Sequence, residues 1–186
     1  MGLMQGKRGV IFGVANDKSI AWGVAQQLRQ QGAELAFTYL NDALAKRVRP
    51  LAESLDSEMI LPCDVQDEAQ IAAVFEAVAK KWGKIDFFVH ALAFANRDDL
   101  KNPFSQTSRE GFQLALDVSA YSLISMTRAA LPVMNDGGGN LFCIDTSVAG
   151  EPIVVFWDHT AGGDQVAEVE AKSFSSWLWA QLNDLE

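Results

Sequence analysis

The sequence contains little cysteine, histidine or tyrosine, with two residues of each among 186. Cys63 and Cys143 stand alone, without CxxC spacing or a neighbouring histidine, which argues against a zinc site, and nothing in the sequence suggests secretion. The formal net charge is -9 and no long basic run occurs, so a general nucleic-acid-binding surface is excluded. The apolar run after Lys7 and Arg8 is too short for a secretory signal or a membrane span. We therefore expect a cytoplasmic globular protein that binds neither metal nor membrane.

Short apolar runs typical of strands alternate along the chain with longer stretches of helical periodicity. This alternation predicts right-handed crossovers between parallel strands, with helices on both faces of the sheet. The expected α/β fold is a Rossmann-type doubly wound parallel sheet in three α/β/α layers, with residues 1–186 as a single domain. Strands are expected within 8–14, 33–39, 58–65, 85–94 and 138–148, and helices within 19–32, 42–55, 67–83 and 108–134.

The stretch GVANDKSIAWG, residues 13–23, joins the first expected strand to the first expected helix. Ligands of such sheets bind beyond the carboxyl ends of the strands. A glycine at a strand end lets the backbone approach a phosphate, and the free N–H groups at a helix start favour its negative charge. Gly13 and Ser19 stand at these two places. The spacing of Gly13 and Gly23 is wider than in the compact GxGxxG motif, so an ordinary strand-to-helix loop remains an alternative.

Several segments of the chain occur together, and in the same order, in one enzyme family. They are GVANDKSIAWG, GAELAFTY, PCDV, KIDFFVHALAFA and SREGF. Together they resemble the NADH-dependent enoyl-acyl-carrier-protein reductases of bacterial fatty-acid synthesis, a divergent branch of the short-chain dehydrogenases and reductases. The likeness runs from about Gly6 to about Ile144. Because the glycine loop of that family has a bulge of this length, the resemblance implies that residues 13–23 cradle the pyrophosphate of NADH.

The resemblance implies a cofactor site assembled from the ends of successive strands. The glycine loop and the helix start contact the diphosphate, and the end of the third strand holds the adenine. The segment after the fourth strand lies on the nicotinamide side, and the backbone of Ala95 contacts the substrate. The implied cofactor contacts are Gly13, Ala15, Ser19, Ile20, Leu40, Asp64, Val65 and Leu92.

Some of these positions have a second interpretation or depart from the family pattern. Asp64 is either an adenine ligand or a helix N-cap. Leu40 stands where the family often has glutamine, and neither an acidic residue nor an arginine stands at this strand end, so NADH is favoured through the family likeness alone. Ala93 stands where the family has glycine. His90 is expected to be a structural residue at the strand end rather than a catalytic base.

The implied reaction delivers hydride to a trans-2-enoyl thioester carried by acyl carrier protein or coenzyme A. In the family a tyrosine supports the enolate and a lysine holds the nicotinamide ribose. At the family's two tyrosine positions this chain has Thr146 and Phe156, and at the lysine position it has Gly163. Lys172 and His159 remain as candidates, with a solvated helix lysine and an ordinary loop histidine as the alternative readings. We therefore assign no catalytic residue from the sequence.

Members of the family continue beyond the point at which this sequence stops. The resemblance therefore implies a fold truncated at the C-terminus, with family-like residues 1–145 and a divergent tail, 146–186. Within the tail, 151–157 favours a strand and 166–182 an amphipathic helix. The family likeness also implies a homo-oligomer.

Three functional hypotheses remain open. The first is NADH-dependent reduction of enoyl-acyl-carrier-protein thioesters. The second is a catalytically impaired dinucleotide-binding pseudoenzyme, or an engineered or truncated relative. The third is an interaction protein with an empty nucleotide site. The first hypothesis predicts NADH binding with turnover, the second predicts binding without turnover, and the third predicts no binding.

Overall fold

The computed structural model describes residues 2–134, 141–145, 153–157, 168–173 and 176. The chain divides into two compact units, Met1–Asn135 and Asp136–Glu186, and each is described by itself. Within the described residues, no helix has both the length and the apolar character that crossing a membrane requires.

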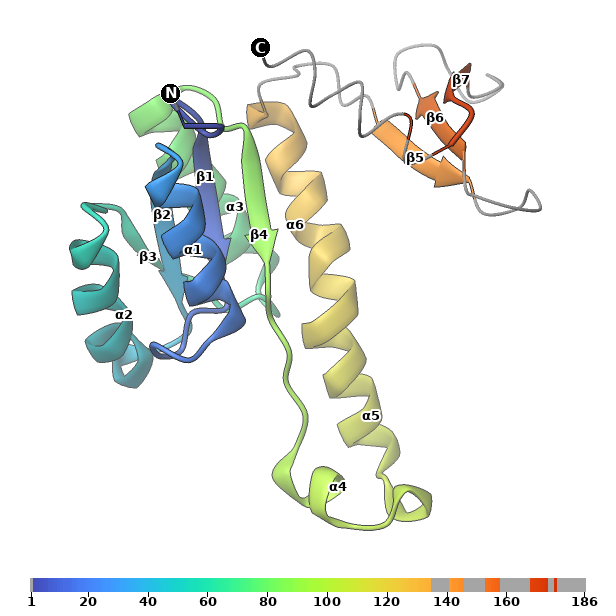
Figure 1. Cartoon of the computed structure of the whole chain (residues 1–186). Coiled ribbons are helices and arrows are strands. Elements are labelled where there is room, and N and C mark those ends of the chain that lie inside the picture. Colours follow the sequence, from blue (N-terminus) through green and yellow to red (C-terminus); the bar gives the residue numbers. More distant parts are fainter. Residues whose placement is uncertain (1, 135–140, 146–152, 158–167, 174–175, 177–186) are drawn as a thin grey trace. The chain divides into compact units, whose positions relative to one another are not determined.

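Four parallel strands form the sheet of the first unit in the order β3-β2-β1-β4 (Figure 1). β1 lies inside the sheet because it pairs with β2 on one side and with β4 on the other. This arrangement confirms the expected parallel, Rossmann-like sheet over its first four strands. The strands are β1 (Arg8–Phe12), β2 (Glu34–Tyr39), β3 (Ile60–Pro62) and β4 (Phe87–His90).

Helices cover both faces of this sheet, as Figure 1 shows for α1 and α3 on opposite sides of β1. Successive residues of a strand point to opposite faces. Val10 and Phe12 accordingly pack in one core with α3 and α6, while Ile11 packs in a second core with α1 and α2. The result is the expected three-layer α/β/α arrangement. The helices are α1 (Ile20–Gln30), α2 (Asp42–Ser54), α3 (Glu68–Trp82) and α6 (Ser122–Ala130).

Polar caps and glycines set the ends of these helices. The side chain of Asn41 accepts the N–H of Leu44 at the start of α2, and Asp67 accepts two N–H groups at the start of α3. Gly32 follows α1 at φ 99° and Gly83 follows α3 at φ 80°, in the left-handed region that favours glycine. The end of the first helix was thus predicted correctly from Gly32.

The segment after β4 is more broken than the sequence predicted. The expected loop 96–107 contains α4 (Arg97–Lys101) and the 3-10 turn η1 (Phe104–Gln106). The expected helix 108–134 consists of α5 (Arg109–Leu116), the π-helical segment η2 (Asp117–Tyr121), α6 and the 3-10 turn η3 (Leu131–Val133). Periodicity does not reveal such a π-helical insertion, because it adds a single residue to one turn of an otherwise continuous helix.

The second unit corrects two predictions. The fifth strand was expected in the parallel sheet, but β5 (Leu141–Asp145) pairs antiparallel with β6 (Ile153–Trp157), which pairs antiparallel with β7 (Glu168–Ala171). The connection 146–152 is too short for the crossover that a parallel neighbour requires, which is about a dozen residues. The helix expected over 166–182 is wrong at β7, whose Val169 pairs with Val155. The strand expected in 151–157 is confirmed by β6.

Candidate functional site

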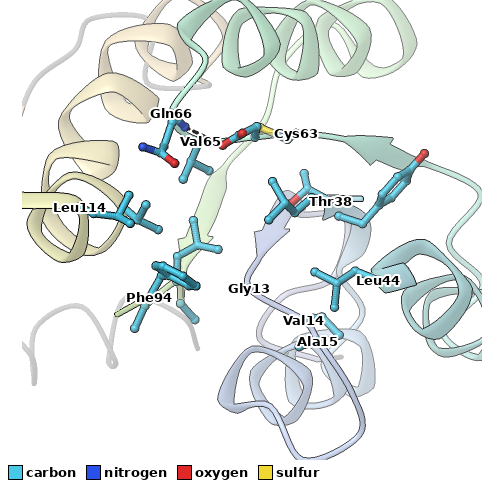
Figure 2. A pocket seen from close by; sticks show the side chains of 17 residues that line it. Gly13, Val14, Ala15, Thr38, Leu44, Cys63, Val65, Gln66, Phe94 and Leu114 are labelled. Carbon is cyan, nitrogen blue, oxygen red and sulfur yellow. Dashed lines mark hydrogen bonds between the residues drawn. The ribbon is translucent and has the colours of Figure 1, made fainter. Parts of the chain in front are cut away.

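A cavity of about 430 Å³ lies at the carboxyl ends of the parallel strands. Most of its lining residues directly follow a strand, and Leu44, Leu114 and Val118 come from helical segments. Figure 2 shows Thr38 and Leu44 on one side of the cavity and Phe94 and Leu114 on the other. The lining residues are Gly13, Val14, Ala15, Thr38, Tyr39, Leu40, Leu44, Cys63, Asp64, Val65, Gln66, Ala91, Leu92, Ala93, Phe94, Leu114 and Val118.

The position of the cavity follows from the order of the strands. The chain runs from β1 to β2 and β3 on one side of β1, and then returns to place β4 on the other side. The order therefore reverses between β1 and β4, which is where ligands of doubly wound sheets bind. Residues 13–15 after β1 and residues 91–94 after β4 both line the cavity.

Gly13 allows these two segments to meet. Its φ is 103°, and a Cβ added there would overlap the carbonyl oxygen of Ala91. An L side chain at this position would thus be strained by its backbone and excluded by its neighbour. Gly13, which the sequence marked as a strand-end glycine, therefore allows the two backbones to approach closely at the mouth of the cavity.

Ser19 organises the loop between Gly13 and α1. Its hydroxyl accepts the main-chain N–H groups of Ala15 and Asn16 over 3.0 and 3.1 Å, and it does not cap the helix. The first turn of α1 contains no acidic residue, whereas the first turns of α2 and α3 contain Asp42 and Glu68. The N-terminal end of α1 therefore keeps the positive potential that attracts an anion.

The walls that follow β2 and β3 are mainly apolar. Among the lining residues in the part of the chain that the structure describes, Asp64 is the only formally charged one.

The Oδ1 of Asp64 accepts the N–H of Gln66 over 3.0 Å, and Asp67, rather than Asp64, caps α3. The N-cap interpretation of Asp64 is wrong. Leu40 is 52% exposed at the end of β2.

Cys63 lies on the cavity wall as a neutral thiol. Burial, followed by the charges of Asp64 and Asp67, raises the pKa of this thiol to about 12. A thiol with such a pKa is protonated near neutral pH and is a poor nucleophile. The Cys63 side chain is buried, with 4% of its surface exposed. Among the described residues, no group of three or more His, Cys, Asp or Glu side chains is arranged to hold a metal ion.

The structure brings six of the predicted residues together on the cavity and leaves three off its lining. Ser19, Ile20 and Ala95 do not line it: Ser19 and Ile20 stand at the start of α1, where Ile20 is 82% exposed, and Ala95 follows Phe94. The binding roles of all nine stay predictions. The six lining residues are Gly13, Ala15, Leu40, Asp64, Val65 and Leu92.

The candidate catalytic residues fall in the second unit. Thr146, His159 and Gly163 lie outside the described residues. Phe156 belongs to β6, and Lys172 is exposed just after β7. Every described residue that lines the cavity belongs to the first unit.

Further lining residues were not predicted. Val14, Gln66, Ala91 and Phe94 neighbour predicted positions, so the rule that ligands bind beyond strand ends was a sufficient signal for them. Leu114 and Val118 carry no such signal, because only the tertiary packing of α5 and η2 brings them to the cavity.

Comparisons with known proteins identify the family of the chain. The model of the enoyl-(acyl carrier protein) reductase family matches residues 13–161. The chain belongs to this family. The match includes the glycine loop and the ends of β2, β3 and β4, and it confirms the family resemblance of the sequence.

Members of the enoyl-(acyl carrier protein) reductase family are similar to the chain over about three quarters of its length. Enoyl-acyl-carrier-protein reductase (NADH) 1 of Rhizobium meliloti (strain 1021) is 54% identical over 140 residues, which are 75% of this chain and 52% of that protein. The Anaplasma phagocytophilum reductase, solved in complex with NAD, is 46% identical with a TM-score of 0.68, over 71% of this chain and 50% of that one. The Bacillus cereus reductase, solved with NADP+ and an indole naphthyridinone, is 48% identical with a TM-score of 0.70, over 74% of this chain and 55% of that one. The chain spans about half the length of the relatives it matches.

Proposed function

We propose that the cavity between β1 and β4 binds NADH. The observation that carries this proposal is the Gly13 cradle, where two backbones meet without room for a side chain at the reversal of strand order. A diphosphate needs such a close approach to the main chain, together with a helix N-terminus that has no acidic side chain. The loop at Gly13 and the start of α1 provide both.

The residues around the cavity fit a dinucleotide laid across the strand ends. The backbone at Gly13 and Ala15 would contact the diphosphate, with Ser19 and Ile20 at the start of α1 beside it. The other predicted contacts divide between the two ends of the cofactor. Leu40, Asp64 and Val65 would face the adenosine half, and Leu92 the nicotinamide half, where the bound cofactor supplies the hydride.

We further propose that this site serves the reduction of trans-2-enoyl-acyl-carrier-protein thioesters in fatty-acid biosynthesis, or of their coenzyme A analogues. The relatives that match the chain are named for this activity. The backbone of Ala95, next to the wall residue Phe94, would contact the substrate.

A second candidate function is dinucleotide binding without turnover. The sequence has two tyrosines, and neither stands at a tyrosine position of the family, where Thr146 and Phe156 are found. Tyr39 lines the cavity from the adenosine side, and Tyr121 is 47% exposed on η2. Without a tyrosine to support the enolate oxygen, hydride transfer loses its main electrostatic stabilisation.

Titration of NADH fluorescence, followed by addition of crotonyl-coenzyme A, separates these functions. We expect saturable enhancement of NADH emission by the full chain. Oxidation of the bound NADH by the thioester, measured as loss of absorbance at the nicotinamide band, would support the reductase. Saturable binding without oxidation would support the second candidate, and the absence of saturable binding would refute both.

Three further properties go with this proposal. We propose a homo-oligomer, supported by exposed apolar side chains on α5, η2 and α6. A cytoplasmic location is supported by the free, buried thiol of Cys63. We also propose that residues 1–186 act as one dinucleotide-binding domain.

A further inference from the structure

Two serine hydroxyls connect the helical segment η2–α6 to the chain that follows β4. The Ser119 Oγ accepts the main-chain N–H of Phe94 over 3.1 Å and donates to the carbonyl oxygen of the same residue over 3.4 Å. The Ser122 Oγ lies 2.7 Å from the Nε2 of His90, the last residue of β4. Both ends of the segment 91–94 are therefore tied to one stretch of helix.

The direction of the hydrogen bond to His90 follows from the other bond of Ser122. The single proton of the Ser122 hydroxyl is donated to the carbonyl oxygen of Val118 over 2.7 Å. The hydroxyl must then accept from His90, which assigns a proton to its Nε2. This nitrogen is thus a donor to a buried serine rather than a free base, as expected for a structural histidine.

These hydroxyls act on residues that line the cavity, although neither serine lines it. Three lining residues are affected. Phe94 donates its N–H to Ser119, the carbonyl oxygen of Val118 accepts from Ser122, and Ala91 directly follows His90. From the side of β1, the Gly13 backbone closes on the carbonyl of Ala91. The wall 91–94 is therefore held between β1 and η2.

We propose that Ser119 and Ser122 are positioning residues that hold the wall 91–94 and Val118 in the conformation that accepts the dinucleotide. The ligand in this inference rests on the proposed function. Without the hydroxyls, the wall samples other positions, and the fraction of molecules competent to bind falls. A lower competent fraction raises the apparent Kd in proportion.

The chain offers a matched control in Ser125, which lies one turn further along α6. Ser125 is also buried, but its hydroxyl donates to the carboxylate of Glu68 on α3 rather than to the wall. We therefore compare Ser119→Ala and Ser122→Ala with Ser125→Ala. Ser119→Thr keeps a hydroxyl and is the rescue variant. Because Ser119 is only partly buried, its variants keep the test valid if Ser122→Ala does not fold.

Amide hydrogen exchange measures the wall without any ligand. In Ser119→Ala we expect exchange of the peptide covering 91–95 to rise about three- to tenfold, the effect of losing one hydrogen bond. Ser125→Ala should leave this peptide within about twofold of the unmodified chain, and Ser119→Thr should restore slow exchange. Unchanged exchange in Ser119→Ala, or an equal rise in Ser125→Ala, would overturn the proposal.

NADH titration of the same variants measures positioning. We expect the Kd to rise about three- to tenfold in Ser119→Ala and Ser122→Ala, to stay unchanged in Ser125→Ala and to recover in Ser119→Thr. Faster exchange of the wall with an unchanged Kd would refute the positioning role. If the unmodified chain binds no NADH, the proposed function fails, while the exchange result still decides whether the serines hold the wall.

Discussion

Gly13 carries two constraints that no other residue type satisfies together. Its φ of 103° disfavours any L side chain, and its hydrogen atoms face the carbonyl of Ala91 where a Cβ would not fit. The first constraint is a property of the loop, and the second is a contact between the segments that follow β1 and β4. A substitution here therefore tests the local conformation and the cavity mouth at once.

We predict that Gly13→Val weakens NADH binding at least about tenfold and lowers the free energy of unfolding by about 1–3 kcal/mol. The added side chain must push the wall after β4 away from the glycine loop. Fluorescence titration and urea unfolding measure the two effects.

Gly23 is the matched control: it ends the stretch 13–23 but is not among the described lining residues of the cavity, and it lies in α1 with open space at its Cβ position. Gly23→Ala should leave the NADH affinity unchanged and raise the free energy of unfolding by up to about 1 kcal/mol. Equal NADH affinity in Gly13→Val and the unmodified chain would argue against the cradle.

At the scale of elements, the cap of α3 couples helix stability to pH. The side chain of Gln70 and the N–H groups of Gln70 and Ala69 hydrogen-bond to the Asp67 carboxylate and hold its pKa below the ordinary value of 3.8. Since the folded state binds the proton less tightly than the unfolded state, this contribution to stability is complete above 3.8. It is lost as the pH falls through the lowered pKa.

We predict that Asp67→Ala lowers the Tm by roughly 2–4 °C at pH 7, because two helix N–H groups lose their acceptor. Asp67→Asn keeps an acceptor without a charge and should lose less. The Tm difference between Asp67→Asn and the unmodified chain should shrink below pH 3.8. A difference that stays constant from pH 7 to pH 2.5, measured by circular dichroism, would contradict the coupling.

Hydrogen bonds connect the π-helical segment η2 to two neighbouring loops. A π-helical segment is a local departure from the α-helix that often occurs at functional sites. Here it supplies Val118 to the cavity and Ser119 to the neighbouring wall, and Gln66 donates to its Asp117 over 3.0 Å. The segment therefore contacts the loops that follow both β3 and β4.

At the scale of the whole molecule, large apolar side chains are exposed along α5 and α6. Phe112, Leu116, Leu123 and Ile124 are each between 45% and 55% exposed. Exposed apolar side chains that gather on neighbouring helical segments are typical of interaction sites. These side chains support the proposed homo-oligomer.

We predict that the chain forms a dimer or larger oligomer at micromolar concentration, and that the double variant Leu116→Glu with Ile124→Glu shifts it to monomer. Two charges cannot be buried in an apolar contact without a large desolvation cost. Light scattering after gel filtration measures the mass. Leu3→Glu, at an exposed leucine outside these helices, is the control and should not change it. A monomeric unmodified chain would refute this assembly.

Much of the first unit follows from local patterns in the sequence. The apolar runs and helical periodicity predicted β1 to β4 and α1 to α3, with the main errors at their ends: β3 and β4 are shorter than expected. Six cofactor positions predicted through the family resemblance line one cavity, because a strand end in a parallel sheet is also a position at the ligand crevice. These features depend on residues that are near one another in the sequence.

Features that depend on distant residues were decided only by the tertiary structure. The sequence marked Gly13 as a strand-end glycine, but the carbonyl that excludes its Cβ belongs to Ala91. Strand pairing likewise depends on which partner the connecting chain can reach, and β5 therefore joined β6 in an antiparallel sheet. The bonds from Ser119 and Ser122 to the wall are of the same kind, because a hydroxyl shows its partner only when folding brings the two together.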